Sequence, residues 1–133
     1  MTAAAVIVAG GSGERFGSPG GKQLALLAGR PVLAWTIEAV AAVDRVDVIV
    51  VACHPERVET YRETIEEVLD PGKPTLFVAG GASRQESVAA ALAWVAPEFE
   101  VVVVHDGARP LTEPGLFDAA LDALADGGYD GVI

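Results

Sequence analysis

The sequence predicts a three-layer, Rossmann-like α/β/α fold built on a mostly parallel sheet. Two observations lead to this prediction. Apolar runs alternate with stretches of helical spacing along the chain, and the runs are continuous, as in strands covered on both faces. Such an alternating order favours parallel strands joined by crossover helices. With 133 residues, 51% of them hydrophobic, the chain can form one domain with a well-filled core.

Strands are expected at five apolar runs. The first is residues 3–9 (AAAVIVA), and the others are residues 46–52, 75–79, 101–104 and a run that opens at Gly131. Cys53 follows the second run and is expected to fill space as a small apolar residue. A domain rarely stops where a strand begins. We therefore expect residues 1–133 to be the N-terminal portion of a longer domain.

Four helices are expected between the strands. Pro31 and Pro55 suit the first positions of the first two, because proline lacks the N–H that a helix start leaves unpaired. Ser83 and Glu86 have the spacing of a capping box at the start of the third. The fourth follows Thr112 and should end at the glycine pair 127–128. Apolar residues at helical spacing should face the core: Leu33, Ile37, Val40, Val58, Tyr61, Ile65, Val68, Val88, Leu92 and Val95. Two tryptophans within these patterns, Trp35 and Trp94, are expected to pack as well.

Three loops of unusual composition follow expected strands: residues 10–23, 80–87 and 105–110. Ligands of parallel sheets bind at the carboxyl ends of the strands, where the strand order reverses. Six of the fourteen residues in the first loop (GGSGERFGSPGGKQ) are glycine, which lets backbone N–H groups approach an anion. Arg15 and Lys22 bring two positive charges to this loop in a chain of net charge -10. The loop therefore predicts a polyphosphate site.

The composition disfavours other classes of partner. Nineteen acidic against nine basic residues argue against binding to nucleic acid or to an anionic membrane. No apolar run is long enough to span a membrane, and the start of the chain does not have the pattern of a signal peptide. A single cysteine excludes an internal disulfide and favours a cytoplasmic location.

The first loop fails two well-known phosphate-binding patterns. It begins like a dinucleotide fingerprint but has Phe16 where the third glycine belongs, which disfavours an NAD-dependent oxidoreductase. A P-loop would need glycine at position 16 and Ser or Thr at position 23, where this chain has Phe16 and Gln23. A plain glycine-rich turn explains the glycines but gives no reason for Arg15 and Lys22.

Three blocks resemble the 2-C-methyl-D-erythritol 4-phosphate cytidylyltransferases of the nucleotidyltransferase superfamily. They are residues 9–15 (AGGSGER) with Lys22 and Gln23, residues 80–87 (GGASRQES) and residues 105–110 (HDGARP). The first block alone indicates the superfamily, and the other two indicate the narrower family. Gly10 replaces the usual alanine, and Gly21 replaces the proline that usually precedes the lysine.

The resemblance implies a nucleotidyltransferase fold that transfers a cytidylyl group from CTP to 2-C-methyl-D-erythritol 4-phosphate in the non-mevalonate isoprenoid pathway. Residues 1–133 would be its CTP-binding portion, and a C-terminal part would supply a dimerisation arm and further contacts to the polyol phosphate. Arg15 and Lys22 would be the catalytic residues. The implied nucleotide-binding residues are Ala9, Gly10, Gly11, Gly13, Arg15, Lys22, Gly81, Ala82 and Ser87, the last three near the cytosine.

The third block implies contacts to a metal and to the acceptor. Asp106, at the end of an apolar strand, would bind Mg²⁺ together with triphosphate oxygens, although an Asp there could also form a turn or cap a helix. Arg109 would contact the acceptor phosphate or brace its own loop. His105 is expected to be structural, Ser83 a helix cap and Arg84 a surface residue.

Two alternatives to this function stay open at the level of sequence. A ribitol-5-phosphate cytidylyltransferase would share these core motifs. A module that binds nucleotide without turnover would keep the fold and lose the activity.

Overall fold

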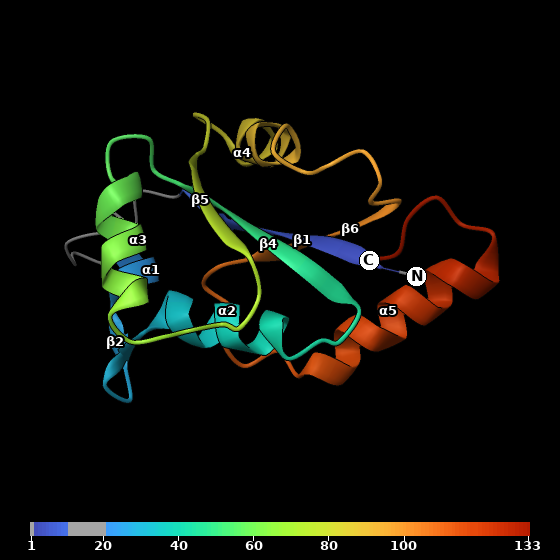
Figure 1. The fold of residues 1–133 in the computed structure, drawn as a ribbon, viewed down its shortest axis with the longest axis horizontal. Coiled ribbons are helices and arrows are strands. Elements are labelled where there is room, and N and C mark those ends of the chain that lie inside the picture. The colour runs from blue at the N-terminus through green and yellow to red at the C-terminus, as the bar shows by residue number, and fades with distance from the viewer. Residues whose placement is uncertain (1, 11–20) are drawn as a thin grey trace.

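The structure, a computed structural model, describes residues 2–10 and 21–133 and contains a four-stranded parallel sheet (Figure 1). Its strands are β1 (Ala3–Ala9), β4 (Val46–Cys53), β5 (Thr75–Ala79) and β6 (Val101–Asp106). They lie in the order β5-β4-β1-β6. The predicted parallel sheet is confirmed, because its three strand pairs are all parallel, and β1 is buried along almost its whole length.

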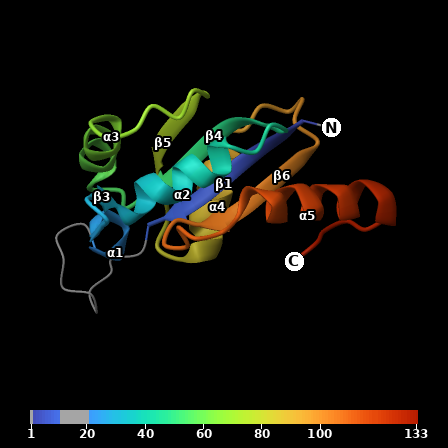
Figure 2. The same cartoon turned by 90° about the horizontal axis from the view of Figure 1, so that it is seen from below.

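Helices cover both faces of this sheet, which gives the three layers that the sequence predicts (Figures 1 and 2). On one face lie α2 (Val32–Ala41), α3 (Val58–Glu66) and α5 (Pro114–Gly127), and α4 (Arg84–Leu92) lies on the other. The larger core is formed on the first face by residues such as Ile7, Leu33, Ile37, Ile65 and Phe117. The smaller core lies beneath α4: Val6, Val50, Ala52, Val78 and Ala91. Within the described ranges, no helix has the length and apolar character needed to cross a bilayer.

The strand order reverses at β1. The chain passes from β1 to its neighbour β4 and on to β5, and then returns to the opposite side of β1 to form β6. The carboxyl ends of β1 and β6 therefore lie side by side at a topological switch point, where open α/β sheets bind ligands. Gly10 follows one of these strands, and Asp106 ends the other.

A short helix and a hairpin precede α2, and the sequence did not predict them. The helix α1 (Gly21–Leu24) leads into β2 (Leu26–Leu27) and β3 (Arg30–Pro31). The two residues between these strands, Ala28 and Gly29, have φ angles of 50° and 83°. Positive φ at both positions is typical of the two-residue hairpin turn whose twist matches that of the flanking strands. Trp35 packs against the hairpin as expected. Its indole N–H donates to the carbonyl of Leu27 at 2.7 Å, and the Arg30 guanidinium lies 4.3 Å from its ring centroid.

The helix ends follow the expected signals closely. The Ser83 hydroxyl accepts from the backbone N–H of Glu86 at 3.1 Å, which confirms Ser83 as the cap of α4. Pro31 precedes the first turn of α2, and the turn that Pro55 begins becomes helical only at Val58. The helix α5 ends as predicted, with Gly128 in the left-handed conformation at φ 64°.

Some expectations are wrong. Val68 and Leu92 were expected to face the core, but each is 41% exposed. Trp94 does not pack, because it follows the last turn of α4 and is 61% exposed. The strand expected from Gly131 is not formed: residues 131–133 are exposed and pair with no strand of the described structure. Apolar sequence alone does not make a strand where no neighbouring strand supplies backbone partners.

Candidate functional site

A cavity of about 450 Å³ opens at the switch point of the sheet. Its walls come from the carboxyl ends of β1 and β6, from α1 and from the first turn of α4 with the loop before it. The lining residues are Val8, Gly10, Lys22, Gln23, Gly81, Ala82, Ser83, Arg84, Ser87, Asp106, Ala108 and Arg109.

Most of the described residues predicted for the site lie around this one cavity. Seven of them line it: Gly10, Lys22, Gly81, Ala82, Ser87, Asp106 and Arg109. Ala9 does not line it, because its side chain is fully buried in the core and it pairs with Cys53 in the sheet. Gly11, Gly13 and Arg15 lie outside the described residues. The structure thus brings the described parts of all three sequence blocks together, while the roles of the individual residues stay predictions.

Asp106 is held between two guanidinium groups. Arg84 donates from Nε and Nη2 to Asp106 Oδ1 at 3.2 and 3.1 Å, and Arg109 donates from Nε to Oδ2 at 3.1 Å. Partial burial raises the pKa of this carboxyl, but the hydrogen bonds and charges of Arg84 and Arg109 outweigh it and lower the pKa below its ordinary value. Asp106 is therefore ionised at neutral pH.

The loop before α4 closes tightly on Ser87. The hydroxyl of Ser87, a buried residue, accepts from the backbone N–H of Gly81 at 3.0 Å. A Cβ at Gly80 would lie 2.7 Å from this hydroxyl oxygen and 3.1 Å from the carbonyl oxygen of Cys53, so only glycine fits there. The next N–H, that of Ala82, donates to the Glu86 carboxylate at 2.8 Å. Both N–H groups are thus engaged within the loop, and the Ser87 hydroxyl also donates to the Gly81 carbonyl oxygen at 3.5 Å.

The loop after β6 is fixed from two sides. The N–H of Gly107 donates to the carbonyl of Val8 at 2.9 Å, and its carbonyl accepts from the Thr36 hydroxyl at 2.7 Å. The ring of His105 packs edge-on against Phe117 with centroids 5.0 Å apart, which agrees with the structural role expected for it. Arg109 braces this loop through Asp106, one of the two roles that the sequence left open.

Five lining residues of the cavity were not predicted as site residues: Val8, Gln23, Ser83, Arg84 and Ala108. Gln23 is only 4% exposed, and its Oε1 has no hydrogen-bond partner among the described residues. Arg84 is exposed, as expected of a surface residue, and it also lines the cavity. A sequence signal for Arg84 existed: the capping box places it in the first turn of a helix that begins at the ligand-binding edge of the sheet.

The described lining of the cavity includes one carboxylate that a metal ion could bind, that of Asp106. Within the described part of the chain no three His, Cys, Asp or Glu side chains converge as a metal cluster would require. A single carboxylate fits Mg²⁺, which takes one or two such ligands and completes its shell with substrate phosphates and water. Asp106 therefore fits a Mg²⁺ ion that is also bound by the phosphate oxygens of a substrate.

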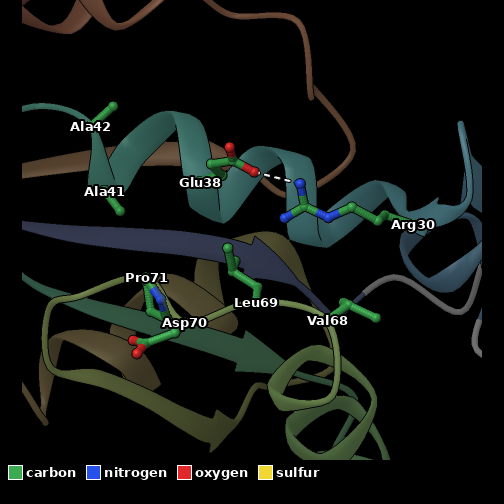
Figure 3. A pocket seen from close by; sticks show the side chains of 8 residues that line it. All are labelled: Arg30, Glu38, Ala41, Ala42, Val68, Leu69, Asp70 and Pro71. Carbon is green, nitrogen blue, oxygen red and sulfur yellow. Dashed lines mark hydrogen bonds and ion pairs between the residues drawn. The ribbon is translucent and has the colours of Figure 1, made fainter.

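A second hollow of about 490 Å³ lies away from the strand ends, between α2 and residues 68–71 (Figure 3). In it Arg30 and Glu38 form an ion pair at 2.6 Å, and Asp70 is the other charged lining residue. Its charge therefore does not favour an anionic ligand. The smaller cavity is the better candidate, because three cationic side chains, Lys22, Arg84 and Arg109, line it beside one carboxylate.

Comparison with solved structures identifies the class of this fold. The synthase of 4-diphosphocytidyl-2C-methyl-D-erythritol from Anaerococcus prevotii aligns with a TM-score of 0.78 at 29% identity, over 94% of this chain and 52% of that chain. A CMP:2-keto-3-deoxy-manno-octonic acid synthetase shares the fold at a TM-score of 0.67 and 19% identity, over 96% of this chain and 49% of that one. The chain therefore has the fold of the nucleotidyltransferases.

Sequence comparison narrows the class to a family. The family model of 2-C-methyl-D-erythritol 4-phosphate cytidylyltransferase matches residues 3–133, and the chain belongs to this family. Curated relatives of that name include one from Parasynechococcus marenigrum, 44% identical over 123 residues, and one from Cereibacter sphaeroides, 46% identical over 125 residues. These alignments cover 92% and 93% of this chain but 53% and 54% of the relatives. The chain spans about half the length of the curated relatives it matches.

Proposed function

We propose that this chain carries the CTP-binding portion of an enzyme that transfers a cytidylyl group from CTP to 2-C-methyl-D-erythritol 4-phosphate. In this reaction an oxygen of the acceptor phosphate bonds to the α-phosphorus of CTP, and the bond from that phosphorus to the bridging oxygen of pyrophosphate breaks. One observation supports the proposal most: a cavity with a cationic lining, at the switch point of a chain with net charge -10, in a member of this family.

The chemistry demands positioning and neutralisation of charge rather than a protein nucleophile, because a phosphate monoester is already an adequate nucleophile at neutral pH. Lys22 is exposed at the cavity wall, and its mobile ammonium group would neutralise charge on the α-phosphoryl oxygens and the departing pyrophosphate. Arg15 would share this role, and the backbone of Ala9, Gly10, Gly11 and Gly13 would contact the triphosphate.

The loop of residues 80–87 would recognise the base. The N–H groups of Gly81 and Ala82 are engaged by Ser87 and Glu86. Their carbonyl oxygens would accept from the 4-amino group of cytosine, which uracil lacks. Ser87 would act mainly by holding the loop in this shape.

Asp106 would be the protein ligand of Mg²⁺, which when bound supplies further charge neutralisation at the triphosphate. Arg109, 71% exposed beside Asp106, would contact the acceptor phosphate. We also propose that the whole protein is a homodimer and works in the cytoplasm.

Pyrophosphate release tests the proposal. The whole protein, given CTP and Mg²⁺, should release pyrophosphate with 2-C-methyl-D-erythritol 4-phosphate and not with ribitol 5-phosphate. Calorimetry on the 133-residue chain should show CTP binding that Lys22→Ala weakens. Release with ribitol 5-phosphate alone would overturn the assignment of the acceptor, and CTP binding without release by the whole protein would make it a binding module.

A further inference from the structure

The backbone of Arg84 is fixed at the edge of the candidate site because α4 begins at this residue. Ser83 caps the helix, so the first helical residue projects from a fixed turn. From this turn the guanidinium reaches the carboxylate that ends β6, and it lines the same cavity as Lys22 and Arg109. The amino end of α4 adds the partial positive charge of a helix N-terminus to this wall.

The ion pairs of Arg84 leave positive charge uncompensated. Arg84 uses Nε and Nη2 on one oxygen of Asp106, while Arg109 binds the other oxygen. One carboxylate cannot neutralise two guanidinium groups. The two arginine side chains are also 60% and 71% exposed, and ion pairs this accessible to water contribute little stability. Moving Arg84 from Asp106 to another anion would therefore cost little.

Orientation of Asp106 does not depend on Arg84. Arg109 lies in the loop that directly follows Asp106, three residues further along, and already binds Oδ2 at 3.1 Å. The N–H of Gly107 and the Thr36 hydroxyl hold the adjacent backbone. A second guanidinium on the carboxylate is thus unnecessary for holding it in place, whereas a planar fork of N–H donors suits a phosphate group well.

We propose that Arg84 is a further substrate-binding residue, which leaves Asp106 and binds a phosphate group of the bound nucleotide or of the acceptor. This inference rests on the proposed function and adds to it a contact that the sequence motifs did not assign. A contact to the nucleotide and a contact to the acceptor should lower the affinity for different ligands, so binding measurements can distinguish them.

The test compares ligands with and without phosphate. Calorimetry or NMR titration on the whole protein would measure CTP, cytidine, 2-C-methyl-D-erythritol 4-phosphate and the phosphate-free polyol, for the unaltered protein, Arg84→Gln and Arg84→Lys. Arg62→Gln is the matched control, because Arg62 lies on α3 and pairs with Glu59 and Glu66 outside the cavity. Circular dichroism would confirm that each variant folds.

We expect Arg84→Gln to weaken one phosphate-bearing ligand by about tenfold to a hundredfold, the range of a hydrogen bond to a charged group. Its phosphate-free counterpart should bind unchanged, Arg84→Lys should lose less, and Arg62→Gln should lose nothing. Loss with CTP would assign the nucleotide, and loss with the polyol phosphate would assign the acceptor.

Two results would overturn the inference. Equal losses for a ligand and its phosphate-free counterpart would mean that Arg84 acts only by shaping the cavity. Unchanged affinities for all ligands would mean that it stays on Asp106. A double variant with Asp106→Asn adds a second check, since losing a direct phosphate contact should still cost affinity without this carboxylate, whereas a role exerted through Asp106 should not. If the unaltered protein binds neither CTP nor the polyol phosphate, the proposed function itself is wrong.

Discussion

The hydroxyl of Thr36 in α2 donates a hydrogen bond of 2.7 Å to the carbonyl oxygen of Gly107, in the loop after β6. Thr36 is fully buried, and Gly107 is buried as well. The helix α2 thus fixes the loop that follows Asp106 and presents Arg109 to the cavity. Stability and substrate binding should therefore respond together to changes at this contact.

Replacing Thr36 tests this coupling. Thr36→Val keeps the shape of the side chain but leaves the Gly107 carbonyl without its donor, so we expect the free energy of unfolding to fall by about 1–3 kcal/mol. CTP binding should weaken too, because the loop is released. Urea unfolding and calorimetry would measure both effects. Thr36→Ser, which keeps the hydroxyl, is the control, and a Val variant as stable as the unaltered protein would contradict the prediction.

Gly107 itself should resist substitution. A Cβ there would lie 2.8 Å from Gln23 Oε1, 3.1 Å from the Val8 carbonyl oxygen and 3.2 Å from Leu33 Cδ1. We expect Gly107→Ala to lower stability by about 1–3 kcal/mol through overpacking. Gly115 in α5 is the matched site, because a Cβ there meets nothing within 4 Å. Gly115→Ala should raise stability by about 0.4–1 kcal/mol in the same urea experiment.

Gln23 should prove more costly to the fold than an apolar side chain of its size. Its buried Oε1 has no partner within the described structure, and an unsatisfied buried polar atom costs about 1–3 kcal/mol. Gln23→Met removes that atom at similar volume and should raise the melting temperature by several degrees. A lower melting temperature would show that the carboxamide is satisfied in solution, by an ordered water for example.

The thiol of Cys53 should be inert in the folded protein. Burial raises its pKa to about 12, from an ordinary value of 9.0. At pH 8 the thiolate population is then about a thousandfold smaller than in the unfolded chain, and alkylation by iodoacetamide should slow by at least that factor. Labelling of native and urea-unfolded protein, followed by mass spectrometry, measures the ratio.

The same pKa makes stability depend on pH in a definite direction. Below about pH 9 the thiol is protonated in both states, so it adds no pH dependence. Between about pH 9 and 12 the unfolded chain loses the proton that the folded protein keeps, so stability should fall by about 1 kcal/mol per pH unit. Cys53→Ala should reduce this slope. An equal slope in that variant would assign it to other groups.

Local patterns predicted the parts of this fold that depend on local chemistry. Four strands were recognised because strands of a parallel sheet covered by helices on both faces read as continuous apolar runs. The cap at Ser83 was recognised because its hydroxyl acts within one turn. Strands of two residues carry no such pattern, so β2 and β3 were missed. Trp94 shows another limit, since helical spacing does not say whether a second element covers that side of the helix.

The location of the site was also predictable from the sequence, but the contacts within it were not. Strand order told where the loops converge, and the glycine-rich and charged blocks told which loops matter, so most of the described lining residues were anticipated. The partners within the site were not. The pairing of Arg84 with Asp106 and the placement of Gln23 beside Gly107 depend on side chains brought together from separate elements. No spacing along the chain encodes such contacts.

The central place of β1 has a consequence for synthesis on the ribosome. Ala3 pairs with Val46 on one side and with Val101 on the other, so β1 leaves the exit tunnel long before its second neighbour, β6, is made. Contacts this distant along a polypeptide slow folding. Until β6 emerges, one apolar edge of the nascent sheet stays open, and that interval is when a chaperone would be of most use to this chain.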